Sequence, residues 1–285
     1  MITGMPRIAI ATPDFDGLVD TCRRKLGLPV IDLTDDTLAT LGARLAMCVP
    51  AGGSHIELMS PADAAAPLSQ SLQRFLDRRG PGLFALMLEA PDPDAEAEAL
   101  ARRGFKVLPR MPGAGGRDIH PNSAHGVLIR VYPVDSFQGR PPPGTPAGPL
   151  SGVMRVQIAV RDLDRAIATF GAGLGLAVDA PLLDSEHGVA RAFVHPPSGG
   201  TIELIAVRDA ARPFAAAVDA RLAAVGEGLY ALVLQARDPQ ALLARWRAAG
   251  FDAQVAAQAA DAAGVIEIPR AALSGALIRI EPTPG

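Results

Sequence analysis

The sequence predicts an α+β protein of two similar domains, each built from two βαβββ modules, so that four modules form two curved mixed sheets. A length of 285 residues suits two domains of average size. Six blocks recur in one order at nearly constant spacing, which chance similarity would not maintain. The paired blocks are Arg7–Asp16 with Arg155–Asp164, Gly27-Leu28 with Gly175-Leu176, Ile56–Leu58 with Ile202–Leu204, Gly82–Leu86 with Gly228–Leu232, Gly104-Phe105 with Gly250-Phe251, and Val127–Val131 with Ala276–Ile280.

The segment between the two copies reads PVDSFQGRPPPGTPAGPLS and is dominated by proline and glycine. Such a run cannot continue a helix or a central strand, and it behaves as a semi-rigid linker. We therefore assign residues 1–133 to a first domain, 134–151 to a linker and 152–285 to a second domain.

The spacing of hydrophobic residues, together with glycine and proline at the ends of segments, predicts the helices and strands of each copy. Asp14 is placed as an N-cap, and Gly27 suits the position that follows the end of the same helix. In the first copy, strands are expected at Arg7–Thr12, Thr37–Val49, Ser54–Met59, Leu83–Glu89 and Gly126–Tyr132, and helices at Asp14–Leu26, Leu68–Arg79 and Pro93–Arg103. In the second copy, helices are expected at Asp162–Leu174 and Pro239–Ala249.

Composition narrows the range of partners and compartments. Hydrophobic residues make up 49% of the chain and charged residues 20%, while a net charge of −3 gives no strong field for nucleic acid or an acidic membrane. The N-terminus lacks the features of a signal peptide, and no apolar stretch is long enough to cross a bilayer. We expect a soluble cytoplasmic protein, with Cys22 and Cys48 as core residues and Trp246 as a partly exposed packing residue.

Several of these blocks resemble the vicinal oxygen chelate superfamily of glyoxalases, methylmalonyl-CoA epimerases, extradiol dioxygenases and bleomycin-resistance proteins. The blocks that carry the resemblance are the helix start Asp162–Ala166, the Ile-Glu-Leu strands around Glu57 and Glu203, the Gly-x-Gly-Leu segment Gly226–Leu229, and the ending from His120 to Ile129. The last two are most similar to the epimerase and glyoxalase branch. The resemblance implies that paired modules curl into a half-barrel, where four strands hold a divalent metal that polarises the substrate.

When the superfamily's four metal-ligand positions are mapped onto this sequence, neither copy keeps the full set of metal-binding residues. Only the second position keeps a carboxylate; arginine stays protonated and offers only donors, and alanine offers nothing. We therefore expect no metal cofactor in either copy. The four positions, in order, fall on Arg7, Glu57, Ala85 and Arg130 in the first copy and on Arg155, Glu203, Ala231 and Arg279 in the second.

Two interpretations of these arginines and glutamates remain open. In the first, Glu57 orients one guanidinium and the remaining positive charge binds a carboxylate or phosphoester ligand. In the second, the same groups form a structural ion-pair network in the space that a metal once filled. Both interpretations require Glu57 and Glu203 to contact an arginine, because buried charges need partners. The expected ligand-binding residues are Arg7, His55, Glu57, Arg130, Arg155, Gln157, Glu203 and Arg279.

His55, Glu57 and Glu203 are the candidate catalytic residues. His55 precedes Glu57 by two positions and so shares its face of the strand, where it could act as a general base. His55, Glu57 and His120 could alternatively form a relocated divalent metal site. The simpler alternative is that His55 is a half-exposed histidine at the start of a strand.

These residues are compatible with three functions. The first is a superfamily member with degenerate metal sites that binds a small, acidic molecule in a sheet cleft. The second is an active metal-dependent lyase, isomerase or epimerase, or dioxygenase that uses non-standard ligands. The third is a structural or protein-interaction duplicate whose clefts are filled by side chains. We expect a small-molecule partner, no nucleic acid or membrane partner, and a monomer or homodimer.

Overall fold

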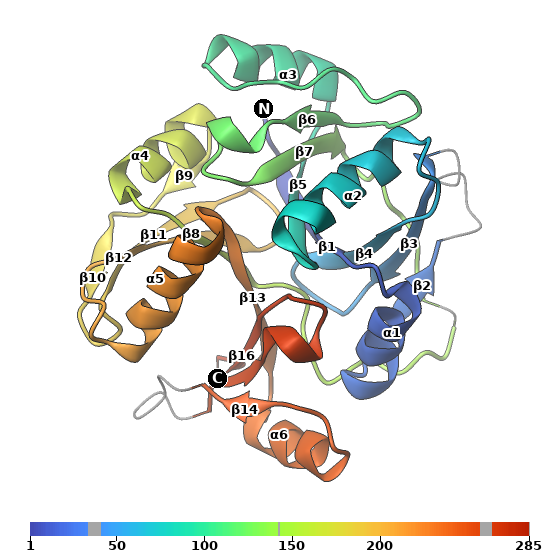
Figure 1. The fold of residues 1–285 in the computed structure, drawn as a ribbon, viewed down its shortest axis with the longest axis vertical. Helices are drawn as coiled ribbons and strands as arrows, with labels where there is room; N and C mark the ends of the chain where they lie inside the picture. The colour runs from blue at the N-terminus through green and yellow to red at the C-terminus, as the bar shows by residue number, and fades with distance from the viewer. Residues whose placement is uncertain (34–40, 142, 257–263, 285) are drawn as a thin grey trace.

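Two mixed β-sheets, one from each sequence repeat, form the framework of the molecule (Figure 1). The computed structural model describes residues 1–33, 41–141, 143–256 and 264–284. In these residues the first sheet has the strand order β2-β3-β4-β1-β5-β7-β6, and the second has the order β10-β11-β12-β8-β13-β16-β15-β14, with β9 paired to β11. The expected α+β architecture of two curved sheets, each with two modules, is confirmed.

The elements follow the same order in both repeats, except that the second repeat has two additional short strands, β10 and β14. The first repeat contains β1 (Gly4–Ala11), α1 (Phe15–Asp20), the π-helical turn η1 (Thr21–Lys25), β2 (Val30–Asp32), β3 (Ala43–Cys48), β4 (His55–Pro61), α2 (Pro67–Arg79), β5 (Gly82–Ala90), α3 (Pro93–Arg102), β6 (Arg117–Ile119), the 3-10 turn η3 (Pro121–Ser123) and β7 (Leu128–Pro133). The second contains β8 (Arg155–Ala159), α4 (Leu163–Ala168), the π-helical turn η4 (Thr169–Gly173), β9 (Ala177–Val178), β10 (Leu182–Asp184), β11 (Val189–His195), β12 (Thr201–Val207), α5 (Pro213–Val225), β13 (Gly228–Ala236), α6 (Pro239–Ala248), β14 (Gln254–Val255), β15 (Ile266–Ile268), the 3-10 turn η5 (Arg270–Ala272) and β16 (Ile278–Pro282).

The predicted elements agree with the structure apart from their ends. Asp14 caps α1 by accepting a hydrogen bond from the Gly17 amide, as its N-cap assignment predicts. The expected helices Asp14–Leu26 and Asp162–Leu174 each divide into a short α-helix and a five-residue π-helical turn. The predicted strand Thr37–Val49 is observed as β3, and its residues 37–40 lie outside the described part of the chain.

Strand pairing puts the expected ligand positions on one face of each sheet, here called the site face. In the first sheet Ala9 is opposite both Glu57 on β4 and Ala85 on β5, and Met87 is opposite Arg130 on β7. Because side chains alternate between faces along a strand, Arg7 lies on the same face as Ala9. The second sheet repeats this arrangement, with Gln157 of β8 opposite both Glu203 and Ala231.

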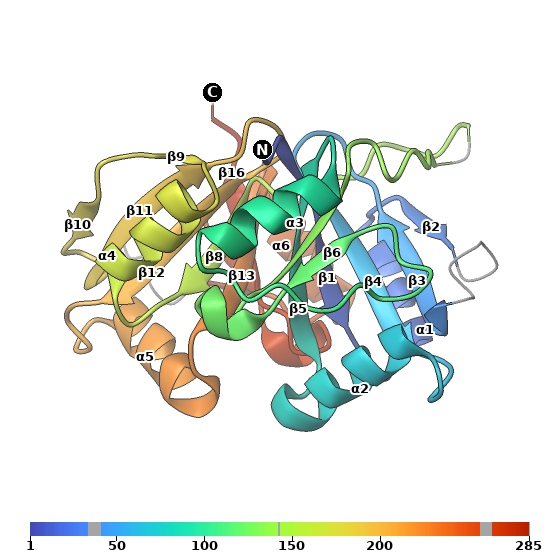
Figure 2. The same cartoon turned by 90° about the horizontal axis from the view of Figure 1, so that it is seen from above.

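Different helices cover the two faces of each sheet. The faces opposite the site faces share one large apolar core with α1, α3, α4 and α6, which spans both domains. The site face of the first sheet packs against α2, and that of the second packs against α5 (Figures 1 and 2). Neither helix was expected to lie over a cleft, and their position decides how much of each cleft is left open.

The two domains contact each other directly through backbone and side chains. Isolated bridges join Met5 to Gly199 and Ser54 to Val153. His125 Nδ1 of the first domain lies 3.0 Å from Glu227 Oε2 of the second. In the described part of the chain no helix combines the length and the apolar character that crossing a bilayer demands.

Two expectations about core residues have different outcomes. Cys22 and Cys48 are buried and unbridged, which confirms their assignment to the core. Trp246 is only 2% exposed, so the expectation of partial exposure is wrong. Its indole packs edge-to-face on Phe251, with ring centroids 5.7 Å apart, inside the core shared by the two domains.

Candidate functional site

An ion pair between Arg7 and Glu57 occupies the site face of the first sheet. Arg7 Nε lies 3.2 Å from Glu57 Oε2, and both side chains are 7% exposed. The guanidinium of Arg7 also lies 4.5 Å from the centre of the Tyr132 ring, a cation–π arrangement. The expected contact between Glu57 and an arginine is therefore present.

Arg130, the other arginine of this face, has a different carboxylate partner. Its Nε and Nη2 donate to Asp118 on the adjacent strand β6, at 2.7 and 3.2 Å. Burial on its own would lower the pKa of Arg130, but the neighbouring Tyr132 and Asp118 more than reverse this, and the pKa is raised. The expected Arg7–Glu57–Arg130 set is thus divided into two separate ion pairs, each electrically balanced.

A longer network crosses the site face of the second sheet. Glu203, which is fully buried, accepts hydrogen bonds from Arg155 Nε at 3.0 Å, Gln157 Nε2 at 2.9 Å and Arg191 Nη1 at 2.5 Å. Arg155 continues to Glu281, and Arg191 continues to Asp184, with shortest distances of 2.6 and 2.7 Å. Burial favours the neutral form of Glu203, but the charges of Arg191 and Arg155 outweigh it and lower the pKa.

Arg279 contacts Glu267 on the adjacent strand β15, with Nε and Oε1 3.4 Å apart. Asp118 and Glu267 are repeat equivalents, and each is opposite its arginine in the strand register. Sequence reasoning missed both carboxylates. The repeat itself could have revealed them, because an acidic residue precedes the arginine by 12 positions in each copy.

Apolar side chains fill the space above both site faces. Leu68 and Leu72 of α2 pack on the first face, and Phe214 and Val218 of α5 pack on the second. The Phe214 ring is 1% exposed and lies 4.9 Å from the Arg279 guanidinium carbon. In the second domain a phenyl ring therefore occupies the position above the expected ligand residues.

A pocket of about 500 Å³ opens at the edge of the first site face, beside the C-terminal half of α2. Its apolar lining includes Phe75 and Phe84, which belong to the core of that face. Its polar lining consists of Arg74, Arg78, Arg79, His120, Asn122 and Ser71, and no aspartate or glutamate is present among these described lining residues.

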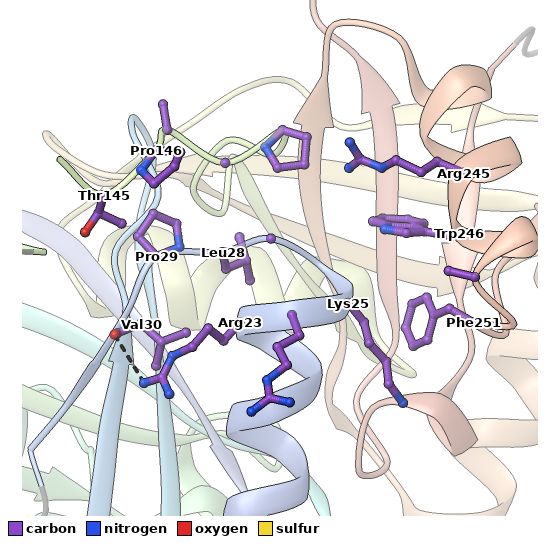
Figure 3. Close-up of a pocket in the computed structure, with 16 residues that line it drawn as sticks. Arg23, Lys25, Leu28, Pro29, Val30, Thr145, Pro146, Arg245, Trp246 and Phe251 are labelled. Carbon is purple, nitrogen blue, oxygen red and sulfur yellow. Dashed lines mark hydrogen bonds between the residues drawn. The ribbon is translucent and has the colours of Figure 1, made fainter.

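A larger pocket of about 900 Å³ lies between α6 and the π-helical turn η1 that continues α1, away from both site faces (Figure 3). Arg23 and Lys25 lie on one wall, Arg245 and Trp246 on the other, and the linker around Pro146 closes one side. Sequence reasoning did not anticipate this pocket.

Comparison with known proteins places the chain in a family. The family profile described as the glyoxalase/bleomycin resistance protein/dioxygenase superfamily matches residues 7–120 and again residues 154–266. The chain belongs to this superfamily. The double match confirms both the resemblance noted in the sequence and the duplication.

Two solved structures share the fold over the whole length of this chain. A variant of 4-hydroxymandelate synthase from Streptomyces coelicolor is 15% identical and superposes with a TM-score of 0.70, over 100% of this chain and 94% of that one. A fusion of a xylose isomerase-like TIM barrel with 4-hydroxyphenylpyruvate dioxygenase is 14% identical, with a TM-score of 0.62 over 100% of this chain and 49% of that one. Methylmalonyl-CoA epimerase from Mycobacterium tuberculosis is 30% identical over 47% of this chain and 89% of its own, with a TM-score of 0.39. No curated protein matches the sequence.

The residues at the superfamily's metal-ligand positions do not fit a divalent cation. Ala85 and Ala231 are fully buried and bring no donor atom, and the one carboxylate of each set already contacts a guanidinium. A divalent metal needs several oxygen or nitrogen donors that are free of cationic partners. Across the residues that can be described, no three histidine, cysteine, aspartate or glutamate side chains gather as a metal site would require.

The relocated set of His55, Glu57 and His120 is accordingly not brought together. His55 packs edge-on to Phe137, and burial together with the charge of Arg7 lowers its pKa. His120 instead lies in the turn before β7, where its Nδ1 accepts a hydrogen bond from the Asn122 amide at 3.1 Å. His120 lines the pocket beside α2.

Proposed function

We propose that this superfamily member binds small acidic molecules without a chelated metal, in the pocket beside α2. One observation carries the proposal: Arg74, Arg78 and Arg79 line the pocket together with His120, and no carboxylate lies among its described lining residues. Guanidinium groups match carboxylates and phosphates with paired, charge-assisted hydrogen bonds. An anion in this pocket would neutralise a charge that the pocket itself leaves unbalanced.

The rest of the pocket lining favours a ligand that also has an apolar part. Phe75, Phe84, Leu108 and Leu128 are among the apolar residues of the lining. A volume of about 500 Å³ is within the range typical of small-molecule sites. We therefore infer an amphipathic ligand, such as an aromatic or branched aliphatic carboxylate or phosphoester.

The proposal moves the ligand away from the residues that the sequence favoured. Arg7, Arg130, Arg155 and Arg279 each have a carboxylate partner, so little net charge is left on the site faces. These pairs support the interpretation of a structural ion-pair network. The alternative of a metal-dependent lyase, isomerase or dioxygenase lacks donors at the ligand positions, and a purely structural duplicate would not need a cationic pocket.

Calorimetric titration with phenylacetate, benzoate and phenyl phosphate tests the proposal. We expect at least one of these acids to bind, and Arg78→Ala to weaken its binding by about tenfold or more, since a hydrogen bond to a charged group contributes about 1.5–3 kcal/mol. Arg78 is exposed on α2, so the variant should fold normally. Arg102→Ala is the matched control, because Arg102 is 72% exposed on α3 and lies outside the pocket. Absence of binding, or equal affinities for wild type and Arg78→Ala, would refute the proposal.

A further inference from the structure

We infer that the groove between η1 and α6 is a second binding site, for a small organic phosphate with two or more negative charges. The groove is the 900 Å³ pocket of Figure 3, here called the junction groove. It shares no lining residue with the pocket beside α2, so this inference does not depend on the proposed function.

Four cationic side chains line the junction groove: Arg23, Arg24, Lys25 and Arg245. No aspartate or glutamate is among the described residues that line it. Arg24 pairs with Asp20 at 2.8 Å, outside the groove, while Arg23 donates to the carbonyl of Val30 at 3.5 Å (Figure 3). The groove thus keeps most of its positive charge, which is unusual in a chain whose net charge is −3.

The internal repeat provides a comparison that argues against a structural role for these cations. The counterpart of this junction lies between η4, which continues α4, and α3, on the opposite side of the molecule (Figure 1). There the equivalent positions are small and uncharged. Arg23, Arg24, Lys25 and Arg245 correspond to Gly171, Ala172, Gly173 and Ala99.

An apolar ring packs closely on the backbone at the counterpart junction. Phe105 packs directly on Gly173, where an added Cβ would lie only 3.1 Å from the phenyl ring. At the junction groove, Phe251 replaces Phe105, and the Nζ of Lys25 lies 5.7 Å from its ring centre. Arg103 at the end of α3 donates to the Gly173 carbonyl at 3.0 Å across this counterpart junction, and its charge is paired with Glu96 at 3.8 Å. The same fold therefore forms the junction without cations at the four equivalent positions, so the cluster of charges beside α6 requires another explanation.

Ligand binding supplies that explanation. Clustered cations repel one another, and a phosphate group relieves this repulsion while accepting hydrogen bonds from the guanidinium forks. The uncharged walls, which include Leu28, Pro29 and Phe251, favour a carbon skeleton attached to the phosphate. A volume of about 900 Å³ is much more than an inorganic ion fills and suits a ligand of nucleotide size.

Titration with ADP tests the inference, with adenosine and inorganic pyrophosphate as comparison probes. Trp246 is the single tryptophan of the sequence and lines the groove, so its fluorescence reports on this site. We expect ADP to bind and to change that fluorescence, pyrophosphate to bind more weakly, and adenosine to bind least. Raising the salt concentration should weaken ADP binding, because the cations are solvent-exposed.

Two variants and a control make the test decisive. Lys25→Ala and Arg245→Ala should each weaken ADP binding by about tenfold or more. Both side chains are exposed, so neither variant should disturb folding. Arg102→Ala removes an exposed arginine from the counterpart helix α3 and should leave ADP binding unchanged. The inference is overturned if wild type fails to bind ADP at low salt, or if both variants bind it as tightly as wild type does.

Discussion

Glu57→Gln is expected to lower the free energy of unfolding by about 3–5 kcal/mol, because it leaves a buried guanidinium without a carboxylate partner. Glu57 is the ion-pair partner that the described residues give Arg7, and the Arg7 side chain is only 7% exposed. Arg130 cannot compensate, since its own carboxylate partner is Asp118. Urea denaturation of the variant and of wild type measures the difference directly.

Glu203→Gln is the matched comparison in the second domain. Its two arginine partners each keep another carboxylate, Glu281 for Arg155 and Asp184 for Arg191. The expected loss is therefore smaller, about 1.5–3 kcal/mol for the charge-assisted hydrogen bonds that are weakened. If Glu57→Gln proves as mild as a surface substitution, the ion pair of the first site face does not exist as described.

At acidic pH, Glu203→Gln should no longer lower the free energy of unfolding. The pKa of Glu203 is lowered from its ordinary value of 4.5 in the folded protein. The stability that its charge contributes is thus complete above pH 4.5 and is lost as the pH falls through the folded pKa. The difference between wild type and this variant should shrink accordingly in acid.

Phe214→Ala should cost about 3–5 kcal/mol of unfolding free energy, because it opens a cavity above the second site face. The Phe214 ring is 1% exposed and lies against Val218, Tyr230 and the guanidinium carbons of Arg191 and Arg279. Removal of the ring loses the stabilisation from its buried apolar surface and from both cation–π contacts. Thermal and urea unfolding of the variant provide the measurement.

Two further substitutions show whether the cavity causes the loss. Phe214→Leu introduces the residue type that the first domain has at the equivalent Leu68, so it should cost much less than Phe214→Ala. Leu183→Ala truncates a side chain that is 67% exposed and should change stability by less than about 0.5 kcal/mol. A cost for Phe214→Ala similar to that of Leu183→Ala would mean that the ring does not fill the cleft.

Much of the fold could be predicted from the sequence because repeats and strand periodicity report directly on topology. The alternation along Arg7–Ala11 and along His55–Met59 places Arg7 and Glu57 on one face, and the strand register agrees. The expected contact between Glu203 and Arg155 follows from the same alternation and is present at 3.0 Å.

The covering helices and the pocket could not be predicted in this way. The apolar pattern of Pro67–Arg79 shows that α2 packs on something, but it does not show which face of which sheet. The pocket beside α2 joins residues from α2, β5 and the turn at His120, which only the tertiary fold brings together. The same holds for the junction groove, where the linker meets two helices that are more than 200 positions apart in the sequence.

The carboxylate partners of Arg130 and Arg279 could have been predicted in part. Asp118 and Glu267 occur at the same position of each repeat, so the duplication contained the information. Their pairing with Arg130 and Arg279 nevertheless depends on the register of a short antiparallel edge strand, and a shift of one residue would put each carboxylate on the opposite face.

We infer that arginine–carboxylate pairs replace the metal chelate of the superfamily in both domains. Elemental analysis of protein purified without chelator, repeated after incubation with manganese, iron, cobalt, nickel and zinc and removal of unbound metal, tests this replacement most directly. We predict that none of these metals stays bound in stoichiometric amount. One metal ion per chain that is lost in Glu57→Gln or in Glu203→Gln would contradict it.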